Sequence, residues 1–141
     1  MSDEYEKYDA FAKQMEERFP KMFANPYGGF CVGEGWWPII ETLCANIQSY
    51  TDWWNKNRET RPVVPQTVVT QVKEKFGGLC FYYDGGDEAV AGMVRMAESW
   101  ASRVCEDCGA PATTHTTGWI KNVCDQHFEQ RETARKERFA E

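Results

Sequence analysis

The sequence predicts an α+β fold, with helices around a β-hairpin, followed by a small cysteine-rich module. Three observations predict it. Two early segments carry apolar residues at helical spacing. A later segment rich in β-branched residues is followed by glycines and then by an aromatic return segment. The last third holds two closely spaced pairs of Cys or His residues. We therefore expect two parts, residues 1–104 and residues 105–141.

The N-terminal half is expected to contain two helices. Residues 3–19 place apolar side chains on one helical face, and a proline follows them. The second helix is expected to begin near Trp37, because Pro38 then occupies a first-turn position where its missing N–H is not needed. It should extend to about residue 54, and the polar, proline-bounded residues 55–65 should form a loop.

A hairpin and a third helix follow. Residues 67–75 and 79–83 are expected to pair as antiparallel strands, with Gly77-Gly78 as the turn. The third helix should begin after Asp87, a residue type that caps helix N-termini, and should run to about residue 104. Its apolar residues at helical spacing are expected to form one buried face, consisting of Val90, Met93, Val94, Ala97, Trp100, Ala101 and Val104.

The last third is organised differently. Residues 105–109 read as a tight knuckle, residues 113–123 as a short hairpin that turns near Gly118, and the charged residues after Cys124 as a C-terminal helix. The ligand-type residues fall as Cys105-x2-Cys108, then fifteen residues, then Cys124-x2-His127. Cys124 and His127 are three residues apart, so they face the same way on a first helical turn.

This spacing predicts a metal site. Three Cys and one His can complete a tetrahedron, which suits Zn²⁺ and leaves no open coordination position. We therefore expect structural zinc held by Cys105, Cys108, Cys124 and His127, and the order knuckle, hairpin, helix resembles a treble-clef zinc finger. The remaining histidine, His115, is expected to be an exposed strand residue.

Composition limits the remaining functions. The 141-residue chain has a formal net charge of −6, and 14% of its residues are aromatic. No segment concentrates Lys and Arg as duplex-binding proteins do, so the charge disfavours nucleic acid as the main partner. The chain has no apolar run long enough to cross a membrane and no apolar signal core near its start. We expect a cytoplasmic protein whose six cysteines bind metal or stay as thiols.

No set of residues predicts catalysis strongly. His115, Asn122 and His127 superficially resemble the residues of HNH nucleases, but the predicted zinc site already uses His127. Cys44 lies on an apolar helical stripe and reads as a core residue. We therefore expect a binding protein rather than an enzyme. Because the chain is rich in aromatic residues and negatively charged, we expect the partner-binding residues to be Trp53, Trp54, Tyr82 and Asp84.

Three segments together resemble a family of small, functionally uncharacterised zinc-binding proteins of bacteriophages and prophages. They are residues 33–44 (GEGWWPIIETLC), 72–88 (VKEKFGGLCFYYDGGDE) and 102–127, which contains the metal-ligand pattern. The resemblance implies a phage origin and no particular mechanism. From the acidic charge, the closed zinc site and the lack of a catalytic set, we expect a protein of the bacterial cytoplasm that binds a host protein, such as a defence or regulatory factor that it would inhibit. The alternatives are a nucleic-acid-binding or nucleotide-binding zinc finger and an HNH-like nuclease.

Overall fold

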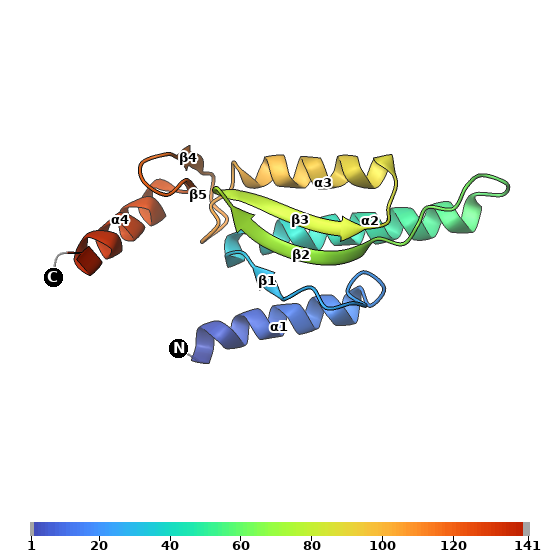
Figure 1. The fold of residues 1–141 in the computed structure, drawn as a ribbon, viewed down its shortest axis with the longest axis horizontal. Coiled ribbons are helices and arrows are strands. Elements are labelled where there is room, and N and C mark those ends of the chain that lie inside the picture. Colours follow the sequence, from blue (N-terminus) through green and yellow to red (C-terminus); the bar gives the residue numbers. More distant parts are fainter. Residues whose placement is uncertain (1, 140–141) are drawn as a thin grey trace.

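The computed structural model describes residues 2–139, and within them the chain has the predicted α+β fold (Figure 1). Its α-helices are α1 (Ser2–Arg18), α2 (Trp37–Asn57), α3 (Glu88–Ala101) and α4 (Asp125–Phe139). The strands are β1 (Phe30–Cys31), β2 (Val68–Lys75), β3 (Gly78–Asp84), β4 (Thr113–His115) and β5 (Lys121–Val123). A short 3₁₀ turn, Glu34–Trp36, leads into α2.

The larger sheet has the order β1-β2-β3. β2 and β3 form the predicted antiparallel hairpin, and the two-residue β1 joins β2 in parallel. The sequence did not predict β1. The smaller sheet pairs β4 with β5, as the predicted short hairpin requires.

One face of the β2–β3 hairpin points into the core and the other points to solvent. Val69 and Val72 of β2 are fully buried, and the exposed fraction of Leu79 and Phe81 of β3 is only 3%. Burial alternates along β3 because successive side chains leave a strand on opposite faces. In β2 a register shift between Val69 and Gln71 lets both Val69 and Val72 face inward although they are three residues apart. The inward side chains join a single apolar cluster with Phe11, Met15, Trp36, Ile40, Leu43, Cys44, Ile47, Val90 and Val94.

α3 lies along the hairpin and runs antiparallel to α2, as Figure 1 shows. Asp87 is its N-cap, as predicted, and accepts a hydrogen bond from the backbone N–H of Val90 at 3.0 Å. The other carboxylate oxygen of Asp87 accepts a hydrogen bond from the Tyr50 hydroxyl, which ties the start of α3 to the C-terminal half of α2. The helix ends at Ala101, three residues earlier than expected.

The predicted glycine-pair turn is wrong by one residue. Gly78 already pairs with Lys75 in the hairpin, so the turn consists of Phe76 and Gly77. Phe76 takes a left-handed conformation with φ +52°, which is uncommon for a bulky residue. Glu74 stabilises the turn, because its carboxylate accepts a hydrogen bond from the Gly77 N–H.

The apolar face predicted for α3 is only partly buried. Val90, Val94 and Ala101 are buried, but the Trp100 side chain is 55% exposed and Met93 is half-buried. α3 packs on both β3 and α2, and Trp100 lines an open space that remains between α3 and α2. Cys44 is fully buried, as the core prediction required.

None of the helices in the described part of the chain is long and apolar enough to cross a membrane.

Candidate metal centre and candidate binding surfaces

The four predicted ligands come together. Cys105 and Cys108 lie in the knuckle after α3, Cys124 lies directly before α4, and His127 lies in the first turn of that helix. One ligand atom from each residue lies within 4.8 Å of the other three. This cluster could hold a metal ion. The sulfurs of Cys108 and Cys124 are 3.8 Å apart, so these two residues are free thiols rather than a disulfide.

The knuckle backbone supports this convergence. Gly109 adopts φ +84°, a left-handed conformation that glycine reaches without a steric penalty. Its N–H donates to the Cys105 carbonyl at 2.8 Å, and the Cys105 N–H donates to the Ala110 carbonyl at 2.8 Å. Burial alone would raise the pKa of the Cys105 thiol, but backbone N–H groups that point at its sulfur lower the pKa overall. The same N–H groups favour a metal-binding thiolate.

The knuckle is closely packed against the 3₁₀ turn that precedes α2. Gly35 donates its N–H to the Glu106 carbonyl at 2.8 Å, and Gly33 donates to the Glu106 carboxylate at 2.9 Å. A side chain at Gly35 would overlap the Cys105 carbonyl oxygen, so the close approach requires a glycine there. The cluster is therefore attached to the core through a close backbone contact at Gly35 and through the Glu106 carboxylate.

Two further hydrogen bonds fix the residue before the knuckle and the strand β5 to the rest of the core. The indole N–H of the fully buried Trp36 donates to the Val104 carbonyl at 2.8 Å. The amide of Asn122, on β5, donates to the Gly77 carbonyl at the β2–β3 turn, with a distance of 2.5 Å. Asn122 is buried and also accepts from the Thr114 hydroxyl, so its side chain is fully engaged in structural hydrogen bonds.

Arg131 holds α4 near the knuckle through ion pairs with Asp107 and, at 3.8 Å, with Glu106. Arg131 donates to both oxygens of the Asp107 carboxylate, at 3.0 and 2.5 Å. This bidentate contact is a strong type of ion pair and fixes the direction of the helix. Beyond its first turns, α4 extends away from the core and contributes no buried residue (Figure 1).

His115 is not the simple exposed strand residue that was expected. Its ring stacks on Phe128 of α4 at a centroid distance of 4.1 Å, and its Nε2 lies 3.0 Å from the Val123 carbonyl. The ring is half-buried by these contacts. Of the residues that prompted the nuclease alternative, His115 packs within the C-terminal module and Asn122 links that module to the β2–β3 turn.

The predicted partner-binding residues fall on two separate elements. Trp53 is 60% exposed on α2, whereas the neighbouring Trp54 donates its indole N–H to the Pro62 carbonyl and stacks under the Arg61 guanidinium. Tyr82 and Asp84 are exposed on β3. Neither ring of the Trp53–Trp54 pair belongs to the apolar core.

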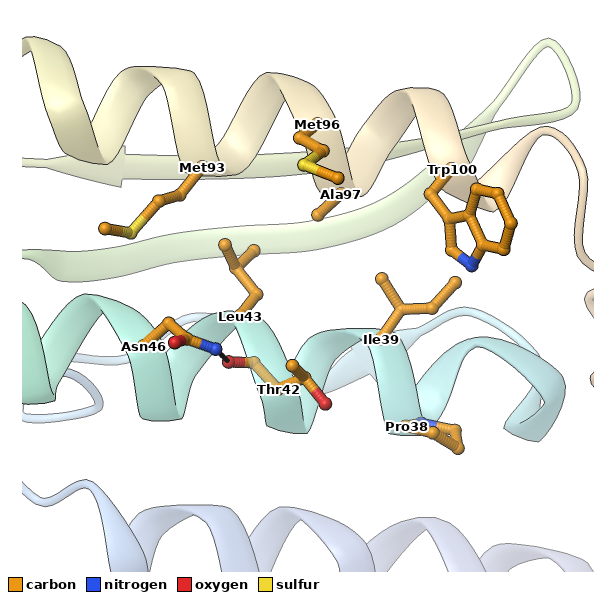
Figure 2. Close-up of a pocket in the computed structure, with 9 residues that line it drawn as sticks. All are labelled: Pro38, Ile39, Thr42, Leu43, Asn46, Met93, Met96, Ala97 and Trp100. Carbon is orange, nitrogen blue, oxygen red and sulfur yellow. Dashed lines mark hydrogen bonds between the residues drawn. The ribbon is translucent and has the colours of Figure 1, made fainter.

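An apolar groove between α2 and α3 was missed from the sequence. It has a volume of about 490 Å³ and is lined by Pro38, Ile39, Thr42, Leu43, Asn46, Met93, Met96, Ala97 and Trp100. Figure 2 shows Trp100 opposite Ile39 at one end, and Met93 opposite Leu43 and Asn46 towards the other. The 3-4 spacing of Met93, Met96 and Trp100 could have indicated a shared face, but it does not separate a groove from a core.

No protein-family model, curated protein or solved structure matches the chain.

Proposed function

We propose that the four-ligand cluster binds Zn²⁺ as a structural ion. In a tetrahedral site with Zn–S bonds of about 2.3 Å, two ligand sulfurs lie about 3.8 Å apart. The Cys108–Cys124 sulfur separation is 3.8 Å, and the Cys105 sulfur lies 3.7 Å from Nδ1 of His127. The donor set of three thiolates and one imidazole also favours zinc over harder cations. These separations support the assignment, and the treble-clef likeness remains part of the proposal.

Zinc in this position would have a structural role, as a crosslink between two segments of the chain. Three thiolates and an imidazole fill a tetrahedral shell, so no position is left for substrate or for a reactive water. The ion would join the knuckle to the start of α4, and the knuckle in turn packs on Gly33 and Gly35 of the core. Because binding free energy and folding free energy are coupled in such modules, zinc loss should unfold residues 105–139 first.

We further propose that the protein acts without catalysis, by binding a host protein through the α2–α3 groove. The observation that supports this function is the groove itself, because no charged side chain lines it although 27% of the chain is charged. Met96 is 74% exposed and Trp100 is 55% exposed along it. An exposed uncharged cleft of this kind is typical of association sites.

The shape favours an amphipathic helix of the partner as the occupant. The groove runs between two antiparallel helices, which is the setting in which a third helix inserts its apolar face. Two methionines provide an adaptable surface for such a face. On α2, Trp53 continues the helical row Thr42, Asn46 and Ser49, so this predicted binding residue extends one wall of the groove. The phage resemblance supports a bacterial host protein as the partner.

The test is affinity capture from bacterial lysate with matched variants. Met96→Glu adds a charge inside the groove, whereas Val63→Glu adds the same charge at an exposed residue of the loop before β2. We expect the wild type and Val63→Glu to recover the same stoichiometric protein, and Met96→Glu to lose it. Recovery that is equal for all three proteins, or no recovery by the wild type, would rule out the groove as the binding site.

A further inference from the structure

The solvent-facing side of the β2–β3 hairpin carries aromatic and basic side chains. Gln71, Lys73 and Lys75 alternate outward along β2, and Cys80 and Tyr82 do so along β3. The Lys73 ammonium lies over the Tyr82 ring at 5.7 Å from its centroid. Between Gln71 and Tyr82 these outward residues include two lysines, and the exposed Asp84 ends β3 on the same face. The positive charge of this face is therefore concentrated near the β2–β3 turn, and Asp84 lies at the opposite end of the hairpin.

Two exposed aromatic rings lie at the turn end of the hairpin. Phe76, in the β2–β3 turn, is 73% exposed, and Trp119, in the β4–β5 loop, is 78% exposed. The β2–β3 turn is in contact with the β4–β5 loop. A Cβ added at Gly77 in the first would lie only 3.0 Å from the Ile120 side chain in the second. The Asn122–Gly77 hydrogen bond fixes the contact. Large exposed rings that no packing requires mark a contact surface.

The Phe76 conformation supports this view. A bulky residue at φ +52° is strained, and strain of this kind persists where the surrounding structure enforces it. The conformation directs the ring to solvent, and the Lys75 ammonium lies 5.6 Å from the ring centroid. Neither Lys73 nor Lys75 forms an ion pair within the part of the chain that the structure describes, so both ammonium groups are free to meet an anion.

We propose that this face binds single-stranded nucleic acid. The binding platform consists of Lys73, Lys75, Phe76, Tyr82 and Trp119. Bases would stack on the three rings, and the two lysines would neutralise phosphates, as in other single-strand-binding surfaces. A duplex keeps its bases stacked on each other and offers mainly phosphates, so two lysines in an acidic chain would hold it poorly. The proposal is independent of the α2–α3 groove, which lies on other elements.

The test uses the full zinc-loaded chain and a fluorescein-labelled deoxythymidine strand about 12 nucleotides long, followed by fluorescence anisotropy. The strand should bind at about 50 mM salt, with a log–log salt slope of about −1.4 for two phosphate contacts. Trp119→Ala should weaken binding about 5- to 150-fold, the range for loss of one stacked base. Phe76→Asn should weaken binding by a similar factor, because Asn tolerates the left-handed turn. Lys75→Gln should reduce the slope by about 0.7.

Phe139→Ala is the matched control, since this ring is 74% exposed at the end of α4 and belongs to neither binding surface. Phe139→Ala should bind the oligonucleotide with the affinity of the wild type. Met96→Glu and Val63→Glu should also bind it with the wild-type affinity. Circular dichroism and zinc content establish that each variant is folded. No binding by the wild type, or equal weakening by Phe139→Ala and Trp119→Ala, would overturn the proposal. Loss of binding to anionic vesicles in Trp119→Ala, with no oligonucleotide binding by the wild type, would assign the platform to a membrane surface instead.

Discussion

The contact between Gly35 and the cysteine knuckle gives the sharpest prediction for mutation. Gly35→Ala places a methyl group where the Cys105 carbonyl oxygen lies and 2.6 Å from the Gly109 nitrogen. Both of these atoms are backbone, so neither can move aside as a flexible side chain could. The knuckle must shift, and the 2.8 Å hydrogen bond from Gly35 to the Glu106 carbonyl is strained with it.

The expected cost is about 3 kcal/mol. Forcing an extra methyl group into a well-packed site costs about 1–3 kcal/mol. Loss of the hydrogen bond adds about 1 kcal/mol. For a chain of 141 residues, the entropy of unfolding near the midpoint is about 0.3 kcal/mol per degree, so the melting temperature should fall by about 10 °C. The variant should also hold its metal less tightly, because Cys105 belongs to the displaced backbone.

Urea denaturation and thermal melting provide the measurement, with Gly92→Ala as the control. Gly92 lies in the middle of α3, and a Cβ added there would have no neighbour within 4 Å, so alanine should be accepted and should stabilise the protein by about 0.5–1 kcal/mol. A Gly35→Ala variant within about 0.5 kcal/mol of the wild type would refute the reasoning, since a change this small is typical of surface sites. It would mean that the knuckle does not pack on the core as described.

Two other substitutions test the core. Asp87→Ala removes the N-cap of α3 and should cost about 1 kcal/mol in chemical denaturation at neutral pH. Burial opposes ionisation of Asp87, but hydrogen bonds from Tyr50 and Val90 prevail and lower its pKa below the usual 3.8. The Asp87 carboxylate therefore contributes fully to the free energy of unfolding above about pH 3.8, and this contribution is lost as the pH falls through the lowered pKa. The cost of Asp87→Ala should shrink over that pH range. A cost that stays constant with pH would contradict this. Trp36→Phe leaves the Val104 carbonyl without its donor and should cost about 1–3 kcal/mol in the same assay, and a neutral result would show that water replaces the indole.

The features that the sequence predicted well depend on neighbours along the chain. Asp87 caps α3 because the N–H that it accepts belongs to Val90, three residues later. The metal ligands were predictable for the same reason, since each pair is separated by two residues and needs only a knuckle or a helical turn to converge. The α+β class followed from periodicity, which is also a local signal.

The features that were missed depend on contacts between distant segments. Apolar spacing predicted a buried Trp100, but which apolar side chains are covered depends on where α2 ends up relative to α3. The Gly35 contact joins residues about seventy positions apart, and a glycine in a loop carries no sign of its partner. The turn at Phe76 was misplaced because two glycines follow it, and only the strand register shows which of them belongs to β3.

The zinc content of the purified chain tests the central claim most directly. Protein prepared without chelator should contain one Zn²⁺ per chain by elemental mass spectrometry, and Cys108→Ser should lose the ion and expose residues 105–139 to protease. Cys31→Ser is the control, because Cys31 is an exposed free thiol outside the cluster, and this variant should keep its zinc. A wild type that neither contains nor takes up zinc, or a Cys108→Ser variant that keeps both its zinc and its protease resistance, would contradict the account.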